Sequence, residues 1–271
     1  MLKNNNILLY LLIIVAALNV GCSTLSGDKE SGNTSKKNDL REPWQLNVDS
    51  ALKAHLTAGV QYLGAGEMGP AHRHLKRALE LDASSVQVHN ALAIFYQAEG
   101  DSTREEFHFK KGLEIDPENS SLKHNYGSSL CRRGLYESSR TYLTSAAADY
   151  HYEGRAESYQ NLGICERQAG NDSAAFAAFE DAYRLNKNLP KAVLGLSQFR
   201  LEKGDNHASY ELYARYLKMA TQNAESLWLG IRLERIFGDK NALASYELAL
   251  RKRFPSSKEF TLYSANSSIK R

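Results

Sequence analysis

Glycines recur in this chain with a period of 34 residues, and this period constrains the fold more than any other feature of the sequence. Three glycines keep the spacing, and three more follow it after a two-residue slip near His151. They are Gly66, Gly100, Gly134, Gly170, Gly204 and Gly238. The spacing predicts six units that begin at Leu52, Val86, Ser120, Ala156, Pro190 and Ala224. A unit of this size cannot bury its apolar face alone, so the units are expected to stack on one another.

Each unit carries the residue pattern of two short helices joined by a turn. In the first unit we expect helices over residues 51–63 and 70–81, with Pro70 in the first turn of the second helix. The pattern resembles the tetratricopeptide repeat. The resemblance implies an all-α fold, an α-solenoid of six such repeats over residues 49–258 that forms a superhelix with a concave groove. A polar tail over 259–271 follows, which either frays or adds a short helix. We expect the slip at His151 to divide the solenoid.

The N-terminus reads as a targeting segment over residues 1–21. Lys3 precedes an apolar stretch of about 12 residues, which is too short to span a bilayer as a mature helix. The stretch ends in Gly21-Cys22-Ser23, which resembles a bacterial lipobox. This resemblance implies cleavage before Cys22 and lipidation of that cysteine. Because Ser23 is not the Asp that resembles an inner-membrane retention signal, we expect an outer-membrane lipoprotein on the periplasmic face. The alternative is an ordinary cleaved signal peptide.

Residues 22–48 are rich in Ser, Gly, Lys, Asn and Asp and lack a hydrophobic period, so they are expected to form a flexible tether. The whole chain carries 34 basic and 31 acidic residues, a net charge of +3. This balance gives no indication of nucleic-acid binding. We expect a monomer.

No motif predicts catalysis, a cofactor or a metal. Residues 64–69 match G-x-G-x-x-G, but helical residues precede them and no strand does, so a turn is the better interpretation. His72 and His74 are two residues apart and should point to different faces of a helix. No cysteine pair has zinc spacing. We therefore expect a protein that is not an enzyme.

Two cysteines follow Cys22. Cys131 is position 12 of the third unit and Cys165 is position 10 of the fourth. A disulfide between neighbouring first helices is possible in an oxidising periplasm. We expect instead two unpaired, half-buried thiols, because the two positions tend to face different sides of the repeat.

The first helices of the units should line the concave groove. In the first two units this lining carries apolar residues with amides among them, namely Leu56, Val60, Leu63, Asn90, Ile94 and Gln97. Such a lining suits an apolar or amphipathic segment of a partner protein. The alternative is that the N-terminal tether folds back over it.

Several short segments point to a more specific family. They are His124–Gly127, Asn161–Gly163, Ala182–Asn186, Ser226–Leu233, Ala244–Tyr246 and Arg253–Pro255. With six units and a lipobox, the chain resembles the PilF/PilW family of type IV pilus pilotins from Cys22 to Phe260. The resemblance implies a lipoprotein that binds the pilus secretin subunit and promotes its outer-membrane targeting and multimer assembly. The alternatives are a scaffold lipoprotein for outer-membrane barrel or peptidoglycan assembly, a periplasmic enzyme with a repeat domain and a purely structural envelope protein.

Overall fold

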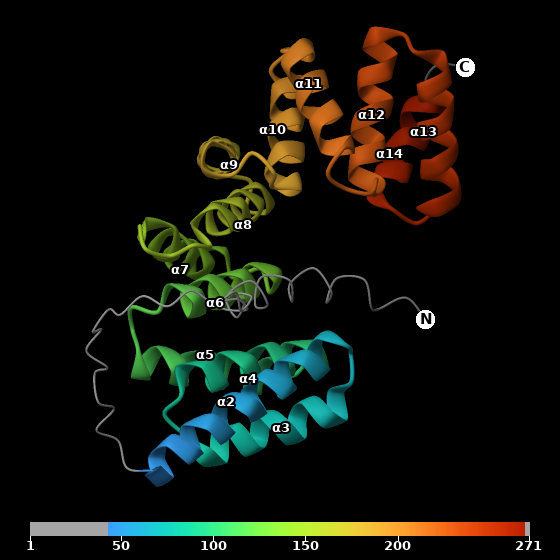
Figure 1. The fold of residues 1–271 in the computed structure, drawn as a ribbon. Coiled ribbons are helices and arrows are strands. Elements are labelled where there is room, and N and C mark those ends of the chain that lie inside the picture. Colours follow the sequence, from blue (N-terminus) through green and yellow to red (C-terminus); the bar gives the residue numbers. More distant parts are fainter. Residues whose placement is uncertain (1–42, 269–271) are drawn as a thin grey trace, which may run out of the picture. The chain divides into compact units, whose positions relative to one another are not determined.

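The computed structural model describes residues 43–268, and within them every regular element is a helix (Figure 1). The helices alternate between the first and second helix of successive repeats, and one further helix follows. Their bounds are α2 Pro43–Gly64, α3 Met68–Leu81, α4 Val86–Glu99, α5 Ser102–Ile115, α6 Ser120–Arg132, α7 Tyr136–Ala148, α8 Arg155–Gln168, α9 Asp172–Leu185, α10 Pro190–Glu202, α11 Asn206–Leu217, α12 Ala224–Phe237, α13 Lys240–Arg253 and α14 Lys258–Ser268. The prediction of an all-α tetratricopeptide solenoid is confirmed.

The turn inside each repeat depends on its glycine. All six glycines of the 34-residue period have a positive φ, between 76° and 90°. A side chain is strained in this left-handed region, which explains why glycine recurs there. In three repeats the next residue is an aspartate whose carboxylate accepts a backbone N–H of the second helix; these are Asp101, Asp205 and Asp239.

The repeats form two compact units, which divide between Tyr126 and Gly127. The sequence predicted a division at His151 instead. The linker that contains His151 joins α7 to α8, and these two helices pack extensively against each other. The two extra residues are therefore absorbed in a surface connection and do not separate the repeats on either side.

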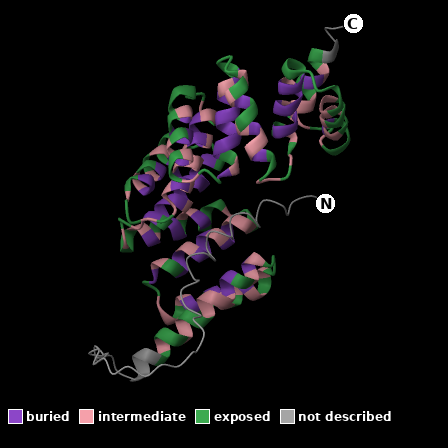
Figure 2. Ribbon diagram, turned by 45° about the horizontal axis from the view of Figure 1, so that its top comes forward, coloured by how far each residue is buried: buried purple, intermediate pink, exposed green. Residues whose placement is uncertain are grey.

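Each compact unit has its own apolar interior, which Figure 2 shows as buried faces on successive helices. In the first unit, Leu75, Leu92 and Tyr96 belong to one core formed by α2, α3 and α4. The small residue at Gly59 lets α2 approach α3, because a Cβ there would lie 2.6 Å from Leu75 Cδ2. Burial of these apolar side chains supplies most of the stability of stacked repeats.

The helical region begins earlier than predicted, and at its other end the tail adds a short helix, one of the two alternatives that the sequence left open. Helix α2 begins at Pro43, eight residues before the predicted start at residue 51, so the last part of the predicted tether is helical. No glycine or proline interrupts residues 44–51. At the other end the predicted polar tail forms α14, whose Tyr263 is buried against Leu227, Ile231 and Leu250.

The predicted signal peptide, Cys22 and residues 22–42 of the predicted tether lie outside the described residues. Within residues 43–268, no helix combines the length and the apolarity that a membrane span requires.

Candidate functional site

The predicted partner-binding residues lie on α2 and α4, and two of them belong to the core. Val60 is 5% exposed and Leu63 is 1% exposed, and both pack in the cluster that contains Leu92. The expectation that stacking leaves these two side chains free is therefore wrong. The physical reason is that α2 contacts both α3 and α4. Repeat positions 9 and 12 are covered in this unit by the neighbouring helices.

The other four predicted residues remain half-buried and accessible. Leu56 and Ile94 pack against the edge of the core with part of each side chain exposed. Asn90 accepts a hydrogen bond of 3.0 Å from the amide of Asn125, and Gln97 donates one of 2.6 Å to Glu105. We call Leu56, Asn90, Ile94 and Gln97 the α2–α4 face. It combines apolar contact area with amides whose positions are fixed by neighbouring side chains.

The same compact unit contains two histidine pairs that were not predicted from the sequence. His55 and His74 bring their Nδ1 atoms to 3.0 Å, and His89 and His108 bring theirs to 2.9 Å. Each pair joins the first helix of a repeat to the second. The members of one pair are each 34 residues from their counterparts, so the repeat period itself was the signal that could have found them.

The second pair has a defined arrangement of protons. The Nε2 atom of His89 lies 3.1 Å from the carbonyl of Ala83, which can only accept, so His89 carries its proton on Nε2. When His89 is neutral, its Nδ1 atom accepts from Nδ1–H of His108. Burial, followed by the charges of His89 and Arg104, lowers the pKa of His108 to about 4. Burial alone lowers the pKa of His124 to about 4, so both rings are neutral at pH 7.

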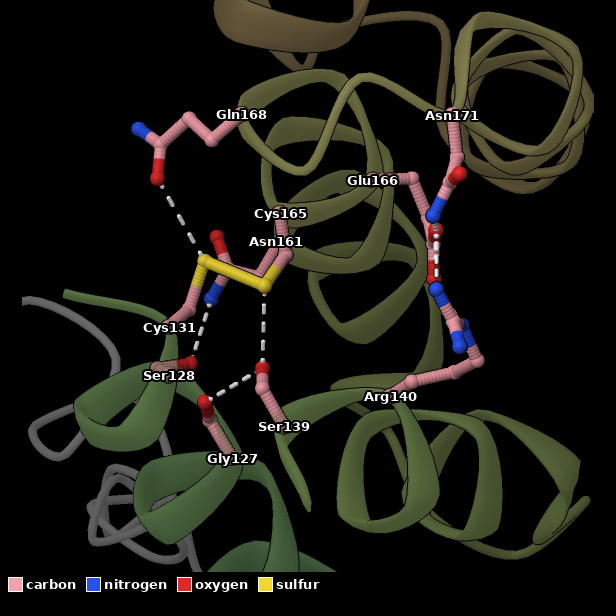
Figure 3. The surroundings of a disulfide bond; sticks show 10 residues. All are labelled: Gly127, Ser128, Cys131, Ser139, Arg140, Asn161, Cys165, Glu166, Gln168 and Asn171. Atoms are coloured by element: carbon pink, nitrogen blue, oxygen red, sulfur yellow. Dashed lines mark hydrogen bonds and ion pairs between the residues drawn. A yellow bond between two sulfur atoms is a disulfide. The ribbon is translucent and has the colours of Figure 1, made fainter. Parts of the chain in front are cut away.

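In the second compact unit, Cys131 and Cys165 form a disulfide between α6 and α8 (Figure 3). Their Cα atoms are 5.6 Å apart, within the range that a disulfide spans. The expectation of two unpaired thiols is wrong. Both cysteines are buried, so position 12 of the third repeat faces its neighbour here and not the open side of the helix.

A buried ion pair lies beside the disulfide. Glu166 on α8 is 3% exposed, and its carboxylate accepts hydrogen bonds from Arg140 on α7 and from Asn171 (Figure 3). Arg140 also donates a hydrogen bond of 2.6 Å to Glu137. The hydrogen bond from Arg140 is the largest of the effects that lower the pKa of Glu166. The carboxylate is thus fully paired and serves to join two helices.

Other residues singled out in the sequence have roles in packing or in turns. His74 faces His55, whereas His72 stacks on Phe95 at 5.0 Å between ring centroids, so the two histidines do point to different faces of α3. Gly66 forms the repeat turn, as expected of the G-x-G-x-x-G segment. Among residues 43–268, no three His, Cys, Asp or Glu side chains are grouped so that they could hold a metal ion.

Comparison with known proteins agrees with the repeat architecture. A family profile described as tetratricopeptide repeat matches residues 119–188. The type IV pilus assembly protein PilF of Pseudomonas aeruginosa is 32% identical over 255 residues, which cover 94% of this chain and 97% of that protein.

Solved structures give the same result. A structure from the functional characterization of Pseudomonas aeruginosa PilF aligns with a TM-score of 0.76 and 32% identity, over 81% of this chain and 99% of that one. PilW, described as a widely conserved type IV pilus biogenesis factor, aligns with a TM-score of 0.67 over 78% of this chain and 97% of that one; at 23% identity it supports the fold alone. The repeats, the extent of the match and the identity together show that this chain belongs to the PilF family of tetratricopeptide-repeat proteins of type IV pilus biogenesis.

Proposed function

We propose that this protein is a lipoprotein of the outer membrane that binds the secretin subunit of the type IV pilus and promotes its assembly into multimers. The observation that carries the proposal is the match to PilF along nearly the whole of both chains. Pilus biogenesis follows from that family membership. Secretin binding and localisation to the outer membrane are the parts of the proposal that go beyond family membership.

In this proposal Cys22 carries the lipid anchor that holds the protein at the outer membrane. It follows an apolar stretch of signal-peptide length. Several acyl chains anchor a protein stably, because each buried methylene contributes about 0.8 kcal/mol. Intact-mass spectrometry of the protein from the outer-membrane fraction should show a chain that begins at Cys22 with added acyl mass. A Cys22→Ala variant should leave that fraction. A mature chain without acyl mass would contradict the anchor.

The binding role is assigned to the α2–α4 face, and it requires no chemistry from the protein. Leu56 and Ile94 offer apolar surface, and the amides of Asn90 and Gln97 can orient a polypeptide backbone through their remaining hydrogen-bonding capacity. Such a mixture suits an amphipathic segment of a partner, in which a few apolar anchors supply most of the affinity.

The test is direct binding of the purified protein to the purified secretin subunit. Ile94→Asp places a charge in the contact and should weaken binding at least about tenfold, since an unpaired charge is costly to bury. Leu185→Asp is the matched control, because Leu185 is exposed on α9 and belongs to the other compact unit. Far-ultraviolet circular dichroism should be the same for all three proteins. Unchanged binding by Ile94→Asp would remove this face from the proposal.

A further inference from the structure

Within residues 43–268, the buried Glu234 lacks a cationic partner such as the one that Arg140 provides for the buried Glu166. Glu234 on α12 follows Glu166 by 68 residues, which is two repeat periods, and it occupies the same position of its repeat. Like Glu166 it is 3% exposed. Its Oε2 atom is buried, and among the described residues it has no hydrogen-bond partner.

The difference arises because the equivalent positions around the two glutamates hold different residues. Arg140 and Tyr210 are each the fifth residue of their helices, α7 and α11, so a phenol replaces the guanidinium. Asn171 and Asp239 each precede the second helix of a repeat, so a carboxylate replaces the amide. The buried acid is kept, but the phenol of Tyr210 and the backbone of Asp239 hydrogen-bond it without supplying the positive charge that Arg140 supplies to Glu166.

The electrostatics of the two glutamates differ accordingly. In the fourth repeat the hydrogen bond from Arg140 dominates and lowers the pKa of Glu166. In the sixth repeat burial and then the charge of Asp239 raise the pKa of Glu234, although Tyr210 and the Asp239 backbone act in the opposite direction. A nearby positive charge would reverse the balance in the sixth repeat, as it does in the fourth.

Aromatic rings that reach the surface lie beside this acid. The charge of Glu234 is the largest cause of the raised pKa of Tyr210, which places the phenol next to the carboxylate. The ring centroid of Phe237 lies 4.8 Å from that of Tyr210 and 5.2 Å from that of His207. Tyr210 and Phe237 are each more than a third exposed. Aromatic faces together with a buried carboxylate favour a guanidinium, which stacks on the rings and donates two parallel hydrogen bonds to the acid.

We infer that Glu234, Asp239, Tyr210, Phe237 and His207 form a binding site for an arginine side chain of a partner polypeptide. The arginine would supply the positive charge that Arg140 of the third repeat supplies to Glu166. The site lies on α11, α12 and the turn before α13 (Figure 1). It shares no residue with the α2–α4 face and belongs to the other compact unit, so the inference does not depend on the proposed secretin binding.

The probe for the site is N-acetyl-arginine methylamide, titrated into the full chain while the amide resonances of Phe237 and Asp239 are followed by NMR. The control probe is N-acetyl-citrulline methylamide, which has nearly the same shape and no charge. The arginine probe should bind about tenfold more tightly than the citrulline probe, the difference expected of a charge-assisted pair. Equal affinities, or no change at these resonances, would overturn the inference.

Three variants locate the effect. Glu234→Gln should reduce affinity for the arginine probe to that of citrulline, whereas Glu166→Gln should leave it unchanged, because Glu166 is already occupied by Arg140. Tyr210→Arg should fill the site from within, abolish probe binding and raise the melting temperature. Undiminished affinity for the arginine probe in Glu234→Gln, or probe binding that survives in Tyr210→Arg, would place the ligand elsewhere and refute the site.

Discussion

Single histidines give the first compact unit a dependence on pH. His124 has a pKa of about 4 in the folded chain and an ordinary value of 6.5 when exposed. The unfolded chain therefore binds a proton that the folded chain excludes. The stabilisation from His124 is present above pH 6.5 and is lost as the pH falls toward 4.

Denaturant unfolding at pH 7 and pH 5 checks this dependence. Lowering the pH should cost on the order of 2 kcal/mol through His124 alone, from the size of its pKa shift. His124→Asn should reduce the loss by that amount, whatever the variant does to stability at pH 7. His151→Asn, a change at an exposed position, should leave the loss unaltered. The same pH dependence in wild type and His124→Asn would show that the ring is not neutral in the folded chain.

At the residue scale, the sequence predicted the positions of turns better than the exposure of individual side chains. A positive φ leaves glycine as the preferred residue, so Gly66 and its five counterparts identify the turns without knowledge of the packing. Exposure is a different matter. Val60 and Leu56 lie on the same helix, and only the placement of α3 and α4 decides that the first is in the core and the second at its edge.

At the scale of helices, the disulfide joins the first helices of two neighbouring repeats. Cys131 and Cys165 are 34 residues apart in the sequence. Repeat numbering placed them two positions out of register because it counted the insertion near His151. The structure keeps this offset, because the equivalent glycines Gly127 and Gly163 are 36 residues apart, and position 12 of one first helix meets position 10 of the next.

Removal of this disulfide should destabilise the second compact unit. A cross-link that closes a loop of this length contributes about 3–4 kcal/mol in the chain-entropy account. The double variant Cys131→Ser, Cys165→Ser should therefore unfold at lower denaturant concentration than the oxidised wild type. Thiol titration of the denatured wild type, without reductant, should find neither cysteine free. Two reactive thiols from these positions would contradict the pairing.

Helix α14 closes the last repeat. Its Tyr263 is buried against α12 and α13, whereas Leu262, its neighbour in sequence, is 41% exposed. Tyr263→Ala should cost about 2–3 kcal/mol of unfolding free energy, as expected when a large side chain is removed from a packed site. Leu262→Ala should cost less than about 0.5 kcal/mol. Equal costs in chemical denaturation would mean that α14 does not pack on the sixth repeat in solution.

At the scale of the whole molecule, the chain has two parts: a repeat region that offers surfaces to a partner protein, and a predicted lipid anchor. The fold class followed from the period and the capping residues, and it is confirmed. The partner does not follow from the period, because every stacked repeat has a surface and each surface depends on side chains that the repeat leaves variable. Glu166 and Glu234 illustrate this: the position is the same, yet Glu166 is paired with Arg140, whereas Oε2 of Glu234 has no hydrogen-bond partner within residues 43–268.

The most direct test of the central claim is the amount of detergent-resistant secretin multimer in the outer membrane. A strain that lacks this gene should lose the multimer, and the wild-type gene or Leu185→Asp should restore it. Ile94→Asp should fail to restore it while the protein accumulates normally. Secretin multimers at wild-type levels in the outer membrane of the deletion strain would contradict the account.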